Sequence, residues 1–220
     1  MNEVALVTGS ETLTGRKLIE KLLARGTKVV APIAGKETDT TESGASNLTV
    51  LTWNRSSWFS TKAVVRESLR LHGRIDAAWL LHHPPSTRSA FADATTGDIE
   101  TVLEQSVKSS VALVRELSGP LSGSRGFLGL VLPYRTGVPA GPMDSLASAA
   151  FAGFAGTFAK EAGPVLWACG FTSTSPDADG FAADLVRLSD EKPEKLRGRW
   201  YRYTGGRRPF GGPSIVDSVL

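Results

Sequence analysis

Apolar and polar residues follow two patterns that alternate along almost the whole chain. Short apolar runs that end in turn-forming residues are typical of buried parallel strands. Such runs occupy residues 4–8, 27–33, 48–53, 75–81, 126–132, 165–169 and 199–206. Pro32 interrupts the second run early. Between the runs, apolar positions recur every three or four residues, which predicts helices. These helical stretches occupy residues 14–24, 58–72, 98–117, 144–161 and 178–188.

Polar residues beside these stretches indicate caps and loops. Thr14 is the expected cap of the first helix, and Asp98 is the expected cap of the longest one. Residues 35–47 are rich in Gly, Ser, Thr and Glu, which predicts a loop. The stretch that begins at Gly205 is rich in Gly, Pro and Arg, which predicts an irregular tail.

Strands that alternate with helices predict βαβ units. We therefore expect an α/β protein: a single-domain, Rossmann-type, doubly wound parallel sheet of about seven strands with helices on both faces. A chain of 220 residues suits one such domain with one large core. We assign this domain to residues 1–204 and the tail to residues 205–220.

The composition limits the cellular compartments and the binding partners that we expect. The chain is 41% hydrophobic and 21% charged, as globular proteins are, and its net charge of +3 is too small to indicate nucleic acid. The basic aromatic run RWYRY and Arg207 form too short a cluster to change this. A single cysteine, Cys169, excludes an internal disulfide and fits a reducing compartment. No apolar run reaches the roughly 18 residues of a membrane helix, and strand sequence from Val4 leaves no room for a signal peptide. We expect a cytoplasmic protein without membrane association.

The order of elements and four short strings resemble the short-chain dehydrogenase/reductase (SDR) family along nearly the whole chain. The strings are VALVTGS…TG, GRIDAAWLL, LEQSVKSSVAL and LRGRWYRYTGG. They are similar to the family's opening TGxxxGxG motif, its fourth strand, the long helix after it and the last strand. The resemblance implies a Rossmann fold, an NAD(P) cofactor and oxidoreductase chemistry, but a fold by itself does not determine function.

The resemblance places the cofactor-binding loop at Thr8, Gly9, Ser10, Leu13, Thr14 and Gly15. Gly9 and Gly15 match the first and third glycines of the motif. Leu13 stands where the middle glycine lets the backbone approach the pyrophosphate. Its side chain would occupy that space unless it turns away, and Glu11 adds a negative charge that disfavours a second anion. A modified NAD(P) site and a structural turn that binds no ligand both agree with these residues, the second slightly better.

The end of the second strand favours NADP over NAD. NAD-binding relatives place an acidic residue there for the ribose hydroxyls. This chain has Ala31, Pro32, Ile33 and Ala34 instead. Lys36 could meet a 2′-phosphate, so NADP is the expected cofactor if a dinucleotide binds.

Two adjacent histidines, His82 and His83, follow the fourth strand, where the family carries the end of an Asn-Asn-Ala-Gly stretch. Neighbouring side chains on an extended chain point in opposite directions. No Cys, Asp or Glu cluster stands nearby at ligand spacing. We therefore expect no metal site here, and the histidines are bulkier than the residues that line the family's cofactor cleft.

The resemblance also implies that the family's catalytic residues are missing. SDR enzymes use a tyrosine as proton donor, a lysine four residues later that lowers its pKa, a serine that steadies the substrate oxygen and an asparagine in the long helix. Alignment places Asp144 at the tyrosine, Ser148 at the lysine and Ser106 at the asparagine, with Pro133 or Tyr134 near the serine. An aspartate is ionised at neutral pH, and a serine has no charge with which to shift a neighbour's pKa.

Other catalytic arrangements find little support in the sequence. Tyr134 is the only tyrosine near the expected site, and Lys160 lies more than about 20 Å along the helix from Asp144. G-x-S-x-G, P-loop and H-E-x-x-H motifs do not occur. We favour a catalytically inactive or severely impaired SDR-like protein, which acts as an oligomer subunit or a dinucleotide sensor. The alternative is an NAD(P)-dependent carbonyl reductase with relocated catalytic residues centred on Tyr134.

Small side chains recur along the helical stretch 144–161, at Ala147, Ala150, Gly153 and either Gly156 or Thr157. Such a stripe allows close contact between helices, either with a partner or with the sheet. SDR proteins commonly assemble through this helix and the long one before it. We therefore expect a homo-oligomer, a dimer or tetramer, through residues 98–117 and 144–161, with a hetero-oligomer with an active relative as the alternative.

Overall fold

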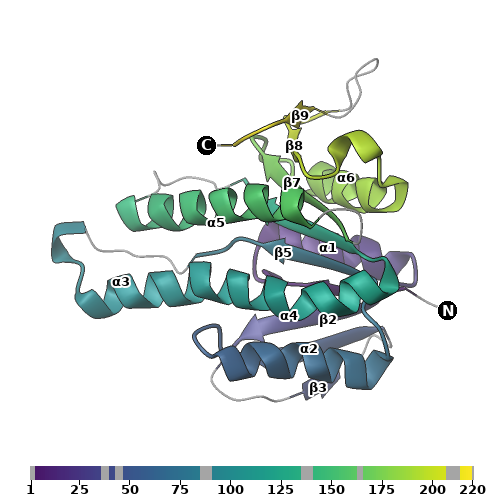
Figure 1. Ribbon diagram of the computed structural model, residues 1–220, viewed down its shortest axis with the longest axis horizontal. Helices are drawn as coiled ribbons and strands as arrows, with labels where there is room; N and C mark the ends of the chain where they lie inside the picture. The colour runs from purple at the N-terminus through teal and green to yellow at the C-terminus, as the bar shows by residue number, and fades with distance from the viewer. Residues whose placement is uncertain are drawn as a thin grey trace.

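The computed structural model describes residues 3–35, 40–42, 47–84, 91–134, 141–162, 166–206 and 214–219. Within these residues the strands form one nine-stranded sheet in the order β3-β4-β2-β1-β5-β6-β7-β8-β9 (Figure 1). Seven strands run parallel: β1 (Val4–Val7), β2 (Lys28–Ala34), β4 (Leu48–Trp53), β5 (Ala77–Leu81), β6 (Phe127–Leu132), β7 (Trp167–Ser173) and β8 (Trp200–Tyr203). Two short strands pair antiparallel at the edges: β3 (Thr40–Glu42) and β9 (Ile215–Val216). The predicted doubly wound sheet of about seven parallel strands is confirmed.

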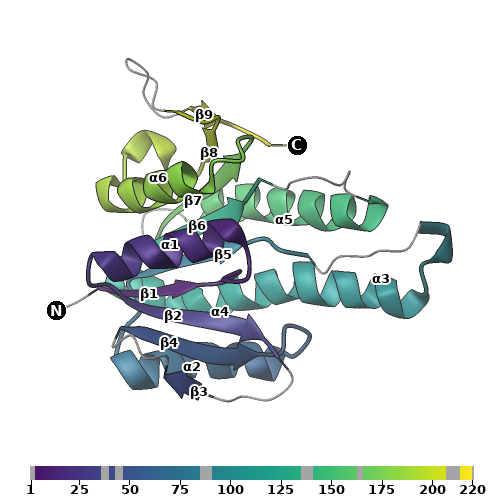
Figure 2. The ribbon, with the colours of Figure 1, turned by 180° about the vertical axis from the view of Figure 1, so that it is seen from behind.

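Helices cover both faces of the sheet, so each face buries its own apolar cluster. One face carries α2 (Trp58–His72), α4 (Ser109–Ser124) and α5 (Pro142–Glu161). The other face carries α1 (Leu13–Ala24) and α6 (Ala178–Glu191), which Figure 2 shows from behind. Short 3-10 turns lie at η1 (Phe91–Asp93) and η4 (Glu194–Leu196). Across the described residues, no helix is both long and apolar enough to cross a membrane.

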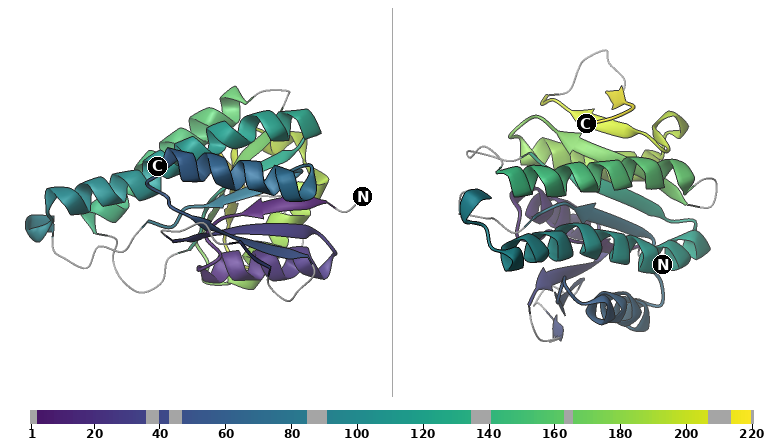
Figure 3. Two further views of the ribbon diagram at one scale, coloured as in Figure 1. Left: turned by 90° about the horizontal axis from the view of Figure 1, so that it is seen from below. Right: turned by 60° about the vertical axis from the view of Figure 1, so that its left-hand side comes forward.

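The longest helical segment has three parts and is longer than predicted. It begins with α3 (Thr96–Val102), continues through a π-helical turn, η2 (Leu103–Lys108), and ends with α4. Its first part and the start of α5 extend past the end of the sheet (Figures 1 and 3). There Val102, Met143 and Ala147 form a small apolar cluster of their own.

The structure corrects both predicted helix caps. Thr12, not Thr14, caps α1, because Thr12 has extended backbone angles and its hydroxyl accepts a hydrogen bond from the N–H of Gly15. Thr95, not Asp98, caps α3. Asp98 instead forms the second half of a capping box, in which its side chain accepts from the backbone N–H of Thr95.

Three strand features also differ from the predictions. β2 continues past Pro32 to Ala34. The N–H of Lys28 faces β1, so by alternation the nitrogen of Pro32 also faces β1, but it lies beyond Leu6 and Val30, the last residues that pair between these two strands. The edge strands β3 and β9 lie in stretches expected to be a loop and an irregular tail. Both form because an edge strand, β4 or β8, offers them a pairing partner.

Candidate functional site

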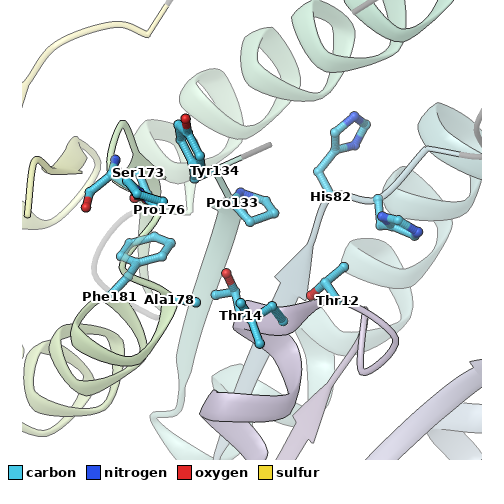
Figure 4. A pocket seen from close by; sticks show the side chains of 12 residues that line it. Thr12, Thr14, His82, Pro133, Tyr134, Ser173, Pro176, Ala178 and Phe181 are labelled. Carbon is cyan, nitrogen blue, oxygen red and sulfur yellow. Dashed lines mark hydrogen bonds between the residues drawn. The ribbon is translucent and has the colours of Figure 1, made fainter. Parts of the chain in front are cut away.

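A cavity of about 280 Å³ opens at the carboxyl ends of β1, β5, β6 and β7 (Figure 4). The chain changes winding direction between β1 and β5, and ligand sites of doubly wound folds occur at such a point. The lining residues are Thr12, Leu13, Thr14, His82, His83, Pro133, Tyr134, Ser173, Ser175, Pro176, Ala178 and Phe181. None of them is a lysine, arginine, aspartate or glutamate. The described cavity is therefore apolar, with hydroxyl and imidazole groups as its polar contacts.

The turn between β1 and α1 is built around Gly9 and Gly15. Gly9 has a φ of 71°, in the region that favours glycine. The N–H and the hydroxyl of Thr12 both donate to the Gly9 carbonyl, at 2.9 and 2.7 Å. A Cβ on Gly15 would lie 2.1 Å from the same carbonyl oxygen. The two matching glycines are thus required by contacts inside the chain, with or without a ligand.

Leu13 and Thr14 open helix α1 at the wall of the cavity. The N–H groups in the first turn of a helix have no acceptor within the helix, and such groups can bind anions. The N–H groups of Leu13 and Thr14 are of this kind. The Leu13 side chain is 54% exposed and lines the cavity, whereas Thr14 is buried. Leu13 therefore faces the space beside the terminus rather than the core. Thr8 and Ser10 flank the turn, and the Thr8 hydroxyl accepts from the N–H of Leu81 at 3.0 Å.

An ion pair joins this turn to the segment that follows β4. Arg55 lies two residues after the end of β4, and its Nη2 lies 3.1 Å from Oε1 of Glu11. Its Nη1 donates to the His83 carbonyl at 2.8 Å, and its guanidinium lies over the Trp53 ring. Glu11 was expected to repel an anion, but the structure shows its charge paired. One arginine thus connects the loop after β1 with the ends of β4 and β5.

The two histidines point to different surroundings, as expected for adjacent residues. His82 is 5% exposed, and its Nε2 lies 3.3 Å from the hydroxyl oxygen of Ser148. Its ring stacks on Phe151, with 4.7 Å between the ring centroids. His83 is exposed. The position aligned with the family's lysine is thus in contact with an imidazole from the end of β5.

Asp144 and Ser106 are the two remaining buried positions that the resemblance matches to catalytic residues. Asp144 is buried one helical turn before Ser148 on α5. Ser106 is buried in the π-helical turn, and its hydroxyl has no hydrogen-bond partner among the described residues. Ser106 and Arg55 both line a void of about 10 Å³. That volume is near the minimum that holds one water molecule.

Tyr134 stands apart from this group. It follows β6, is 40% exposed and lines the larger cavity together with Pro133 (Figure 4). Lys160 lies near the far end of α5 from Asp144. Lys36 and Arg207, which the sequence analysis also named, lie outside the described residues.

Sequence reasoning missed Arg55 and the residues that α6 and β7 contribute. Arg55 carried a usable signal, because a charged residue within two positions of the end of a buried parallel strand lies at the ligand-binding edge of the sheet. Ser173, Ser175 and Phe181 carried none, because only the packing of α6 beside β7 brings them to the cavity.

Comparison with known proteins gives a match by structure alone. No family model matches the sequence, and no curated protein does. An SDR protein from Serratia marcescens superposes with a TM-score of 0.74 at 14% identity, over 93% of this chain and 96% of that one. This chain has the SDR fold. An SDR-family oxidoreductase from Brucella ovis, in complex with a partially ordered NAD, has a TM-score of 0.74 at 15% identity, over 93% of this chain and 100% of that one.

A third SDR-fold structure is YwfH, an NADPH-dependent reductase of bacilysin biosynthesis. Its TM-score is 0.73 at 13% identity, over 94% of this chain and 100% of that one. At these identities the likeness establishes the SDR fold of this chain, and the activity has to be argued from the site.

Proposed function

We propose that this protein is a non-catalytic protein on the SDR fold that works as a subunit of an oligomer. The observation that carries this proposal is the contact between Ser148 and His82. It places a neutral hydroxyl and an imidazole where the family resemblance requires an ammonium group. The partner position, Asp144, offers a carboxylate in place of a phenol.

This substitution removes the proton chemistry that the resemblance implies. A phenol becomes a useful acid near neutral pH only when a nearby positive charge lowers its pKa. Ser148 has no charge, and Lys160 is at the other end of α5. The two aligned positions, Asp144 and Ser148, therefore offer neither a phenol nor an ammonium group to assist a carbonyl reduction.

The cleft also fits a dinucleotide poorly. A pyrophosphate at the first turn of α1 would meet the Leu13 side chain, which lines the cavity there. The pair of Arg55 and Glu11, held to the His83 carbonyl, joins the turn after β1 to the segment that follows β4. A dinucleotide would have to move these side chains. The similar structures include a complex with NAD and an NADPH-dependent reductase. We propose that neither NAD nor NADPH is a working cofactor of this chain.

One observation favours a second candidate function. Tyr134 carries a phenol, is 40% exposed and lines the cavity. In an NADP-dependent carbonyl reductase with relocated catalytic residues, Tyr134 would be the proton donor. A dinucleotide sensor would bind NADPH in the same cavity without oxidising it. Titration with NADPH shows whether the dinucleotide binds, and a turnover assay then distinguishes a sensor from a reductase.

The assembly surface that we propose is formed by α4 and α5. The predicted small-residue stripe divides in the structure: Ala147 is buried inside the chain, whereas Gly153 and Thr157 are exposed. Leu146 on the same helix is 49% exposed, and Val111 on α4 is 37% exposed. Small and apolar side chains on adjacent helices allow a second copy, or an active relative, to pack closely.

Mass measurement tests this assembly. Light scattering after size-exclusion chromatography should give the mass of a dimer or tetramer for the wild type and of a monomer for Gly153→Glu. The introduced carboxylate would be buried in the contact between subunits without a partner charge, which destabilises that contact. Glutamate is a better helix former than glycine, so the variant should fold. Ala183→Glu, on the exposed side of α6, is the matched control and should keep the wild-type mass. A monomeric wild type would refute the subunit proposal.

A further inference from the structure

Helix α2 carries a basic face with one exposed aromatic side chain. The residues of this α2 face border a shallow depression along one side of the helix: Phe59, Lys62, Ala63, Arg66, Glu67 and Arg70. Phe59 is 85% exposed, more than any other large apolar side chain among the described residues. Arg70 pairs with Glu67, whereas Lys62 and Arg66 form no ion pair within the described part of the chain. The α2 face therefore has two uncompensated cations beside an uncovered aromatic ring.

The helical segment that projects past the end of the sheet has the opposite charge (Figures 1 and 3). Its first part, residues 91–104, contains η1, α3 and the start of η2, and we call it the arm. The arm includes four carboxylates and no Lys, Arg or His. Asp93 and Glu100 are exposed and form no ion pair with any described residue. Phe91 and Leu103 are also exposed. The arm thus combines free acidic groups with uncovered apolar side chains.

The arm and the α2 face complement each other, but they do not meet within one chain. Among the described residues no ion pair joins them, and Glu104 of the arm pairs with Lys108 instead. The arm extends beyond α2, as Figure 3 shows. Unlike charges attract over a Debye length, and covering Phe59 removes apolar surface from water. A second copy of this chain offers both the charge and the apolar side chains that the α2 face lacks.

We propose that the arm of one copy docks on the α2 face of a second copy. The carboxylates of the arm approach Lys62 and Arg66, and its apolar side chains cover Phe59. The contact is heterologous, because each copy offers one surface of each kind, so it can continue from copy to copy. It uses neither α4 nor α5, so it goes beyond the assembly surface proposed above and does not depend on it.

Other anionic partners fit the α2 face less well than a protein segment does. Glu67 lies on this face and would repel a nucleic-acid backbone or an anionic lipid surface, where negative charges are closely spaced. Phe59 is the one aromatic side chain of the face, whereas binding of single-stranded nucleic acid uses several stacked rings. A protein segment can place carboxylates beside the two free cations and leave Glu67 unopposed.

Sedimentation velocity at two ionic strengths tests the contact. One helix face is smaller than a standard protein interface, so the contact should be weak and should depend on charge. Charges act over about 30 Å at about 10 mM salt and over about 3 Å at about 1 M salt. The mass of the wild type should therefore rise with protein concentration at the lower salt concentration and not at the higher one. The mass in high salt reports the contact of α4 and α5, so that proposal can fail without affecting this test.

Two charge reversals distinguish the surfaces. Arg66→Glu alters the α2 face and Glu100→Arg alters the arm, and both side chains are exposed without an ion pair, so both variants should fold. In low salt each variant alone should associate about tenfold more weakly than the wild type. An equimolar mixture should regain association, because Arg66→Glu keeps an intact arm and Glu100→Arg keeps an intact α2 face. Lys195→Glu and Glu194→Arg, at exposed positions of η4, are the matched controls and should associate as the wild type does.

Several results would overturn the proposal. These are a wild type whose mass in low salt equals that in high salt, single variants that associate as the wild type does, and a mixture that regains nothing. Controls that lose as much association as Arg66→Glu and Glu100→Arg would show a general effect of net charge. Titrations with phosphatidylserine vesicles and with a thymidine oligonucleotide cover the other anionic partners. Binding of either that Arg66→Glu abolishes, without association between copies, would assign the α2 face to that partner instead.

Discussion

At the scale of single residues, contacts inside the chain are enough to explain the cofactor-like motif in the turn after β1. Gly9 has a positive φ, which favours glycine, and a Cβ on Gly15 would collide with the carbonyl oxygen of Gly9. Thr12 satisfies the Gly9 carbonyl twice and also caps the helix. These three residues serve the fold directly. The motif in the sequence therefore indicates a strand-turn-helix unit more surely than it indicates a ligand.

Replacing Gly15 by alanine tests this reading of the turn. The added Cβ would lie 2.1 Å from the carbonyl oxygen of Gly9, so we expect the free energy of unfolding to fall by about 2 kcal/mol. Alanine elsewhere inside a helix is usually better than glycine by up to about 1 kcal/mol. Gly123→Ala in α4 is the control, because nothing lies within 4 Å of its added Cβ. Urea denaturation measures both, and equal effects of the two substitutions would contradict the account.

A second residue-scale prediction concerns pH. The Nε2 of His72 lies 3.3 Å from the Thr49 hydroxyl oxygen, and burial followed by the charge of Lys28 lowers the pKa of His72. In the unfolded chain this group has a pKa of about 6.5, so as pH falls through that value the unfolded state takes up the proton first. The free energy of unfolding should therefore fall between about pH 7.5 and about pH 5.5. His72→Gln should lose less stability over this range, and equal losses in both proteins would contradict the assignment.

At the scale of elements, the sequence predicts what local periodicity controls. The spacing of apolar residues gave the helix at residues 58–72 with the bounds that the structure has. It did not reveal β3 or β9, because two- or three-residue strands form only where an existing edge offers hydrogen bonds. The same limit applies to the site. The alignment named Leu13 and Ser148, but the partners of Ser148 and Glu11 come from the ends of other strands, which only tertiary structure brings together.

The attachment of α6 to β8 gives a prediction at this scale. Asp177 caps α6 by accepting from the N–H of Gly180 at 2.9 Å, and it also accepts from the Tyr203 hydroxyl at 2.6 Å. Asp177→Ala removes the cap and leaves Tyr203 without this acceptor, so we expect a loss of about 2 kcal/mol in the free energy of unfolding.

The control for this substitution lies two residues away. Asp179→Ala breaks an exposed ion pair with Lys21, so we expect it to cost less than about 0.5 kcal/mol. Thermal denaturation ranks the two variants. A loss in Asp179→Ala as large as that in Asp177→Ala would show that surface charge, and not the cap and the tyrosine contact, stabilises this helix.

At the scale of the whole molecule, the chain has the SDR fold, and its cavity lies at the carboxyl ends of the strands, where ligands of doubly wound folds bind. The cavity beside α6 is open and has no charged residue among those that line it, apart from what its histidines can carry. Arg55 and Glu11 join the turn after β1 to the segment that follows β4. The resemblance assigns Asp144 and Ser148 to the positions of the proton donor and its cation, and His82 contacts the second of these. We propose that the protein acts in assembly or ligand binding and not in hydride transfer.

The most direct test of this conclusion is a single-turnover assay. Protein in excess over NADPH is mixed with a panel of aldehydes and ketones, and the absorbance of the reduced nicotinamide is followed over time. Our account predicts that NADPH disappears no faster than it does without protein, in the wild type and in Tyr134→Phe alike. Oxidation of NADPH by the wild type that Tyr134→Phe abolishes would contradict the account and establish a reductase with a relocated proton donor.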